Sequence, residues 1–247
     1  MNPSSVFSLR SKKDFEKKAL EIFHFQADHN PVYKKYVEQL GINPEKVKTV
    51  SQIPFLPIEF FKTQKVVTSS VICHPSSVIF LSSGTTGMER SKHHVSDICV
   101  YEKSFRKCFK IFYGDVKQHA VLALLPSYYE NRNSSLMYMM QDLIKRSKNK
   151  YSSFYNHKDE NILQVLQTIL QKKQKVILVA VSFALLDFAE QFSLPDGEGR
   201  GGAFIVIETG GMKGRREEIT REELHKTLCK KFRVKKKCCK EKIILFH

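Results

Sequence analysis

The sequence has 247 residues, enough for one large or two small domains, and its hydrophobic content of 42% is enough for a real core. It has no run near the roughly 18 apolar residues of a membrane span, and its start lacks a secretion signal, so we expect a cytoplasmic protein without a membrane span. The net charge of +16 is scattered, apart from a tail that holds seven Lys and one Arg against one Glu from Cys229 onward. A scattered excess is typical of a solvated surface, so we expect no nucleic-acid partner and keep a basic nucleic-acid-binding protein as a disfavoured alternative.

The cysteines and histidines show no spacing typical of a metal site. There is no Cys-x-x-Cys pair, and His93 and His94 are adjacent, so on any regular element they face different ways. We predict no metal site and no disulfide framework. The six cysteines are Cys73, Cys99, Cys108, Cys229, Cys238 and Cys239.

The first part of the chain predicts helices. Apolar residues at helical spacing indicate a helix over residues 12–29, and a second short helix runs from Pro31 to Gly41, a C-terminal cap. Prolines then predict an extended crossing that leads to a single helical turn at 58–61. This crossing is either a packed connector or part of an acyl pocket.

A strand at Val78–Leu81 runs into a bend rich in glycine and hydroxyl groups. Glycines let successive N–H groups point into one concavity, the hydroxyls add donors, and two cations follow, which together suit a polyphosphate. It is neither a Walker A loop nor Gly-x-Gly-x-x-Gly, and an ordinary surface turn is the alternative. The candidate phosphate-binding residues are Ser82, Ser83, Gly84, Thr85, Thr86, Gly87, Arg90 and Lys92.

Strands and helices alternate from here to the end of the pattern. Ser96 can cap a helix that reaches Phe112, and further helices are expected around 136–144, 162–170, 185–192 and 221–232, the last with a Thr220–Glu223 capping box. Strands are expected at 120–125, 175–181 and 203–207. We therefore predict an α/β fold, a mainly parallel sheet with helices on both faces, preceded by a helical segment.

Polar loops follow three of the predicted strands. A parallel sheet collects ligands at the carboxyl ends of its strands, so we expect the loops 82–87, 127–133 and 208–216 to converge there. In the last loop, paired glycines allow the close approach of a ring or ribose. Its cations serve a phosphate or carboxylate, or form a solvated basic turn; they are Lys213, Arg215 and Arg216.

Several sequence blocks resemble the adenylate-forming superfamily of acyl-CoA synthetases and luciferases. The Ser82–Gly87 bend is similar to its phosphate-binding signature, and the blocks at 53–62, 125–128, 133–136 and 208–216 resemble one branch, the LuxE-type acyl-protein synthetases. The resemblance implies a partial N-terminal domain of such an enzyme: a helical segment over 1–75, an adenylation region over 76–232 and a basic tail of non-family sequence over 233–247.

The resemblance also implies an activity. ATP, carrying Mg²⁺, would lie with its triphosphate along Ser82–Gly87, and a fatty acid would be activated as acyl-adenylate and passed to a cysteine thiol, with an acyl-reductase or acyl-transfer protein as partner. The adenine or ribose would be contacted by Gly210, Gly211, Met212 and Lys213, and the acyl pocket by Tyr128 and Tyr129. The family's Tyr-Gly-x-Thr-Glu motif and its acyl-accepting cysteine are absent, so we expect a truncated chain with impaired turnover. The alternative is a catalytically inactive ATP- or partner-binding remnant.

Overall fold

The computed structural model describes residues 3–68, 77–82, 90–125, 133–156, 161–192, 204–210, 212 and 214–232. It divides the chain into two compact units. The first comprises residues 1–105 and 133–135, and the second comprises residues 106–132 and 136–247. The predicted domain boundary at 75/76 and the predicted tail from 233 onward lie outside the described residues.

The first unit begins with a 3₁₀ helix, Pro3–Ser8, and the helix α1, Lys12–His29. A capping box starts α1, since Ser11 Oγ accepts from Asp14 N and Asp14 Oδ2 accepts from Ser11 N, both at 3.1 Å. The helix predicted over residues 12–29 is therefore confirmed. It buries Phe23 and Ala27 on one face.

The second helix, α2 (Pro31–Gln39), packs on α1. Asn30 caps it, Pro31 occupies its first turn, and Gly41 just beyond it takes a left-handed φ of +67°, as the sequence predicts. A small core lies between these helices and the segment that follows. Its buried members are Phe23, Ala27, Tyr33, Val37 and Val47.

An extended segment crosses this small core. It contains two short 3₁₀ helices, Pro44–Lys46 and Val50–Gln52, and leads to the four-residue helix α3, Phe60–Thr63, close to the predicted turn at 58–61. Two tyrosine hydroxyls of α2 hold it: Tyr33 donates to Pro54 O at 2.7 Å and Tyr36 to Phe55 O at 3.2 Å.

The strand β1, Val78–Leu81, pairs with β2, Lys92–Val95, as an antiparallel hairpin in which Leu81 faces Lys92. In the described part of the chain β1 pairs with β2 alone. Our expectation that the 82–87 bend leaves the same parallel sheet as the 208–216 loop is therefore wrong. β2 could not be predicted from the sequence, because its Lys-His-His-Val pattern lacks the apolar alternation of a strand.

Helix α4, Ile98–Tyr113, begins in the first unit and ends in the second, because the division falls between Phe105 and Arg106. The side chain that caps its first turn is Asp97, which accepts from Cys99 N at 2.9 Å, and not the predicted Ser96. In the first unit Tyr101 of α4 packs on buried Phe80 of β1, with ring centroids 5.2 Å apart.

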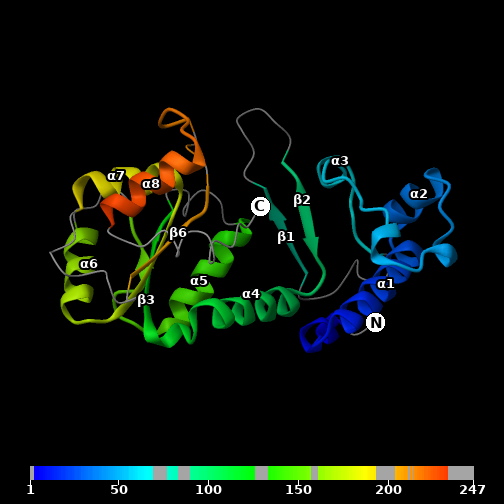
Figure 1. Cartoon of the computed structure of the whole chain (residues 1–247), viewed down its shortest axis with the longest axis horizontal. Coiled ribbons are helices and arrows are strands. Elements are labelled where there is room, and N and C mark those ends of the chain that lie inside the picture. The colour runs from blue at the N-terminus through cyan, green and yellow to red at the C-terminus, as the bar shows by residue number, and fades with distance from the viewer. Residues whose placement is uncertain are drawn as a thin grey trace. The chain divides into compact units, whose positions relative to one another are not determined.

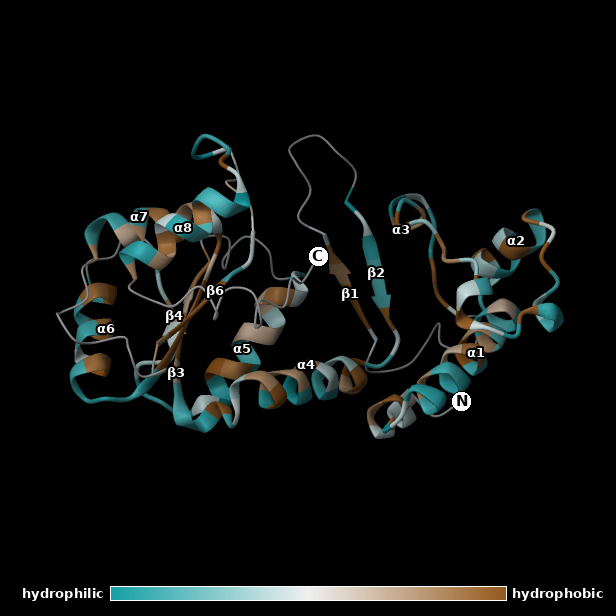
Figure 2. Ribbon diagram, viewed as in Figure 1, coloured by the Kyte–Doolittle hydropathy of each residue, from teal (hydrophilic) through white to brown (hydrophobic). Residues whose placement is uncertain are grey.

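The second unit is built on a four-stranded parallel sheet in the order β4-β3-β5-β6 (Figure 1). A 3₁₀ turn, Val116–Gln118, leads into β3, His119–Leu124, which is buried along its whole length; β5 is Lys175–Ala180 and β6 is Phe204–Glu208. All three were predicted, and Figure 2 shows them as apolar ribbons. The two-residue edge strand β4, Ser153–Phe154, is too short to be found from the sequence.

Four helices complete this unit: α5 (Ser135–Ser147), α6 (Asn161–Gln171), α7 (Ser182–Gln191) and α8 (Arg221–Lys231). All four lie where the sequence predicts a helix. Figure 1 shows α5 on one side of the strands and α6 and α7 on the other, as right-handed crossovers require when the chain reverses direction across the sheet. The fold is therefore α/β with helices on both faces. Among the described residues, no helix combines the length and apolarity needed to cross a membrane.

A cluster of four phenylalanines closes the core beneath α8. The ring of Phe232 lies 6.0 Å from those of Phe188 and Phe192 and meets Phe204 of β6 edge-on at 5.8 Å. Phe232 is completely buried. Thr220 and Glu223 form the predicted capping box at the start of α8, which fixes where the helix begins and brings Phe232 to the core.

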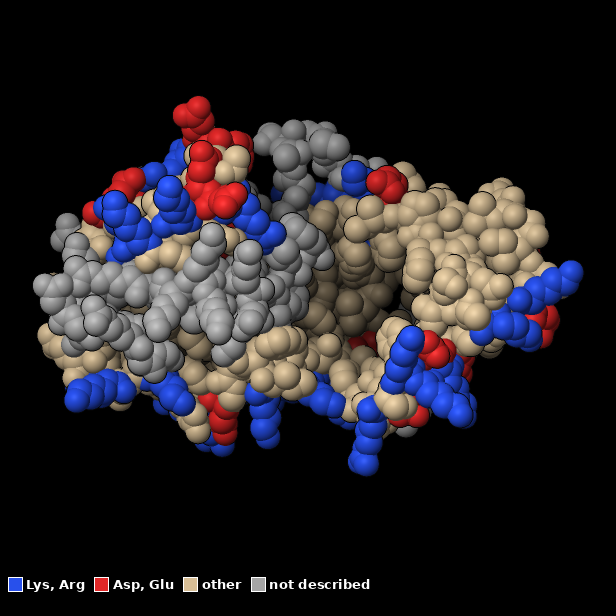
Figure 3. Space-filling view, viewed as in Figure 1, with Lys and Arg blue, Asp and Glu red and all other residues tan. Residues whose placement is uncertain are grey.

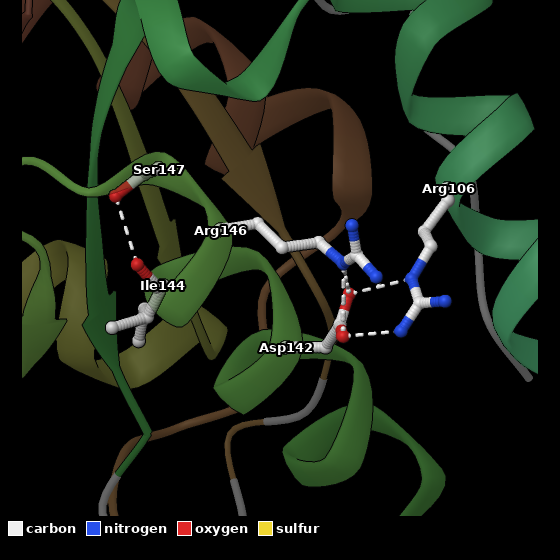
Figure 4. A network of polar contacts seen from close by, with 5 residues as sticks. All are labelled: Arg106, Asp142, Ile144, Arg146 and Ser147. Carbon is white, nitrogen blue, oxygen red and sulfur yellow. Dashed lines mark hydrogen bonds and ion pairs between the residues drawn. The ribbon is translucent and has the colours of Figure 1, made fainter.

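One carboxylate ties α4 to α5 in the second unit (Figure 4). Asp142 accepts from Arg106 Nε at 2.9 Å and from Arg106 Nη2 at 2.5 Å, and Arg146 Nε lies 2.9 Å from the same carboxylate. Burial alone would raise the pKa of Asp142, but the hydrogen bonds from the two guanidinium groups outweigh it and hold this pKa below the ordinary value.

We expect Asp142→Asn to lower the free energy of unfolding by about 1–2 kcal/mol at neutral pH, because charge-assisted hydrogen bonds to two arginines are lost. Because the pKa of Asp142 is lower in the folded protein than its ordinary value, the ionised carboxylate stabilises the fold at any pH above that ordinary pKa. This stabilisation is lost as the pH falls through the lower, folded-state pKa. The difference between variant and wild type, measured by urea unfolding, should therefore shrink below pH 4. A difference that does not change with pH would contradict this assignment.

Candidate functional site

The carboxyl ends of β5 and β6 form the best-defined candidate site. Ala180 pairs with Glu208 where the two strands end. The Ala180 carbonyl then accepts from both Thr209 N, at 3.0 Å, and Thr209 Oγ1, at 3.2 Å. This double contact fixes the chain at the point where it leaves the sheet, the location at which parallel sheets collect ligands.

A buried carboxylate stands at the same end of the sheet. Glu208 is 5% exposed and its Oε1 accepts from Ser182 Oγ at 2.5 Å, a short charge-assisted hydrogen bond. Ser182 is the first residue of α7, so the carboxylate lies at a helix N-terminus, where the macrodipole favours negative charge. Neither Glu208 nor Ser182 was predicted from the sequence to have a role of its own. The one sequence feature that could have pointed to them is that each directly follows a predicted apolar strand, at 175–181 or 203–207.

The bend after β6 depends on glycine. Gly210 is half-buried and takes a φ of +86°, in the left-handed region that L side chains rarely adopt. Among the described residues, a Cβ there would meet only Glu208 Oε1, at 3.9 Å. Met212 is buried and anchors the far side of the bend. Gly211 and Lys213, also predicted to contact adenine or ribose, lie outside the described residues.

The two arginines that close this bend are engaged with the protein itself. Arg215 lies over the Phe183 ring at 5.0 Å, and Arg216 donates from Nε to Asp187 at 2.8 Å and pairs through Nη1 with Glu190 at 2.9 Å. The hydrogen bonds that Arg216 donates to Glu190 and Asp187 outweigh burial and raise the pKa of its guanidinium. Arg216 therefore binds two carboxylates of α7, which is neither the ligand contact nor the solvated turn that the sequence left open.

The hairpin that carries the other predicted bend is closed at its base. Ser82 N donates to Ser91 O and Ser91 N donates to Ser82 Oγ, each at 3.0 Å, and Ser91 is buried. Arg90 and Lys92 are exposed on the returning strand side. The predicted residues Ser83, Gly84, Thr85, Thr86 and Gly87 lie outside the described residues. So do Tyr128 and Tyr129 of the predicted acyl pocket.

The described cysteines and histidines form no metal centre. Within the described residues, no three His, Cys, Asp or Glu side chains are placed to hold a metal ion. His93 stacks on Phe61 with centroids 4.7 Å apart, while burial and nearby Lys65 and Lys92 lower the pKa of His94. Cys99, Cys108 and Cys229 are free thiols, and burial raises the pKa of Cys108, which makes it a poor nucleophile at neutral pH.

Two comparisons with known proteins gave no match. No protein-family model matches the chain, and a search of the curated proteins gave no match.

Proposed function

We propose that this chain is an ATP-dependent protein of the acyl-protein synthetase type, which activates a fatty carboxylate as an acyl-adenylate. The sequence blocks that resemble LuxE-type enzymes support the proposal, above all the Ser82–Gly87 bend and the block at 208–216. The structural observation that carries it is the bend after β6. Gly210, with φ +86°, follows β6 and Thr209 there, and Thr209 N donates to the Ala180 carbonyl. Among the described residues, only Glu208 Oε1 would meet a Cβ at Gly210, so this bend is where we place the flat ring of the nucleotide.

The proposed chemistry needs charge neutralisation and alignment of two anions. A carboxylate oxygen of the fatty acid attacks the α-phosphorus of ATP; the new P–O bond forms as the bond to the bridging oxygen breaks, and pyrophosphate leaves. The N–H groups and hydroxyls of Ser82–Gly87, with Arg90 and Lys92, would bind the triphosphate. Mg²⁺ would be carried by the ATP phosphates. A cysteine thiolate of a partner protein would then take the acyl group and release AMP.

A second candidate is an ATP- or partner-binding protein without turnover. It is favoured by Arg216, whose charge is already neutralised by the carboxylates of Asp187 and Glu190 and is not available to a phosphate.

One pair of measurements separates the two candidates. Isothermal titration with MgATP should show binding for the first candidate and for the ATP-binding form of the second. Incubation with ATP, a long-chain fatty acid and labelled pyrophosphate should label ATP only if the adenylation step runs, and the label must require the fatty acid. Binding without exchange would select the second candidate. Absence of ATP binding would refute the first candidate and leave only the partner-binding form of the second.

We expect Gly210→Ala to weaken ATP binding and to lower the free energy of unfolding by about 1 kcal/mol, because alanine is strained at φ +86° and adds a methyl group where we place the flat ring. Gly41→Ala is the matched control. It meets the same strain at φ +67° with nothing within 4 Å, so it should cost similar stability and leave ATP binding unchanged. Equal loss of ATP binding in both variants would contradict a nucleotide-binding role for Gly210.

A further inference from the structure

Six exposed lysines gather at the amino end of the parallel sheet, opposite the candidate site. We call this surface the basic edge. It lies on the turns that lead into β3, β4 and β5, and Figure 3 shows several Lys and Arg side chains along the lower border of the second unit. Its members are Lys117, Lys148, Lys150, Lys172, Lys173 and Lys175.

Hydrogen bonds between side chains join these loops into one surface. Lys175 is the register partner of His119, and its Nζ donates to Gln118 at 3.3 Å, beside Lys117. Lys172 Nζ donates to the Tyr151 hydroxyl at 3.1 Å, which brings the turn before β5 against the loop before β4. The lysines of the basic edge therefore lie on neighbouring loops of the folded protein, although they are spread along the sequence.

Two of these lysines occupy strained backbone positions. Lys148 has a φ of 52° and Lys173 a φ of 53°, and they are the only residues other than glycine with positive φ in the part of the chain that the structure describes. Each stands just past the end of a helix, α5 or α6, where glycine is the usual residue. A strained position occupied by a charged side chain is a reason to look for a function of that charge.

Two lysines of the basic edge contact the ring of Tyr151. Lys150 and Lys172 lie 5.1 and 5.6 Å from the centre of the same Tyr151 ring, and the hydrogen bond from Lys172 lowers the pKa of that phenol. Across the described residues, none of the six lysines forms an ion pair. The nearest carboxylate in sequence, Asp115, accepts from the backbone N–H of Lys117.

Two exposed apolar side chains lie close in the chain to the basic edge. Ile111 is 68% exposed and Phe112 is 38% exposed, both in the last turn of α4, and the 3₁₀ turn Val116–Gln118 connects this helix to β3. Phe109 of the same turn packs edge-on against His119, the first residue of β3, so this end of α4 is fixed at the amino end of the sheet. Large apolar side chains beside lysines are typical of proteins that lie on a membrane surface.

We propose that the basic edge, with Ile111 and Phe112, binds the surface of a membrane that contains anionic lipids. The lysines supply charge complementarity to the lipid headgroups, and the apolar side chains enter the interface. The loops at one end of a sheet lie at similar depth, which suits a flat partner. A nucleic acid fits less well, because it would leave Ile111 in water, and because the edge has no arginine among its six cations to grip phosphate with two hydrogen bonds.

The test is sedimentation of the full chain with vesicles of phosphatidylcholine alone or with about one-third phosphatidylserine, at low and physiological salt. We expect binding only to the anionic vesicles, weakened by salt. The double variant Lys148→Gly and Lys173→Gly should bind about tenfold more weakly. It should also unfold at an equal or higher temperature, since glycine relieves the strain. Ile111→Ser should weaken binding without changing its dependence on salt.

The matched control is Lys34→Gln with Lys35→Gln on α2, which removes the same charge from an exposed helix. It should bind like wild type. Equal loss in control and edge variants would overturn the proposal, because net charge or the basic residues after 232 would then carry the binding. Binding to neutral vesicles with the same affinity, or binding to a single-stranded RNA oligonucleotide but not to anionic vesicles, would overturn it as well.

Discussion

Replacing Phe232 by alanine is expected to lower the free energy of unfolding by about 4 kcal/mol, because the change empties the centre of an aromatic cluster. Phe232 has no exposed surface and contacts Phe188 and Phe192 of the α7 region and Phe204 of β6. The loss therefore separates α8 from both the sheet and the neighbouring helix. Urea unfolding followed by circular dichroism measures the change.

Phe55→Ala is the control for this experiment. Phe55 is 74% exposed, so removal of its ring should change stability by less than about 1 kcal/mol. If the Phe232 variant proves as stable as the Phe55 variant, the packing of α8 described above is wrong. If it fails to fold, Phe232→Leu should restore a folded chain of intermediate stability, since leucine fills much of the cavity.

The second large effect concerns ATP. We expect Thr85→Val together with Thr86→Val to weaken ATP binding at least tenfold, because two hydroxyl donors are lost from the bend proposed to bind the triphosphate, and a site built to hydrogen-bond loses affinity when its polar partners are removed. Isothermal titration with MgATP measures this loss. The same variant should show no fatty-acid-dependent pyrophosphate exchange.

The control replaces a threonine hydroxyl elsewhere by a methyl group. Thr168→Val removes a hydroxyl that donates to Gln164 O within α6, so it should leave ATP affinity unchanged. A double variant of Thr85 and Thr86 that binds ATP like wild type would remove the main support for a phosphate-binding bend, whatever the outcome at Gly210.

Local signals in the sequence were sufficient to predict most of the regular elements. The helices 12–29 and 221–232 could be placed because apolar residues recur at helical spacing, and the Thr220–Glu223 capping box also marks the start of the second. The strands β3 and β5 could be placed because they are continuous apolar runs, as strands buried on both faces are.

What the sequence did not predict depends on partners far along the chain. The edge strand β4 exists only because Ser153 and Phe154 meet β3, and the pairing of β1 with β2 is set by a hairpin whose second strand carries no apolar pattern. At the candidate site, Gly210 was identified because glycine pairs mark such bends, whereas the contact between Glu208 and Ser182 was not, because neither residue identifies its partner.

The order of the strands also has a consequence for how the chain folds while it is being synthesised. β3 pairs with β4 through only two residues, and its long partner is β5, which is synthesised after α5 and α6 have emerged. Until then β3 is an apolar segment with an open edge, the kind of segment that associates with other nascent chains. Expression at reduced temperature or with added holdase chaperones should therefore raise the yield of native protein, because both favour the unassociated chain while β5 is being made.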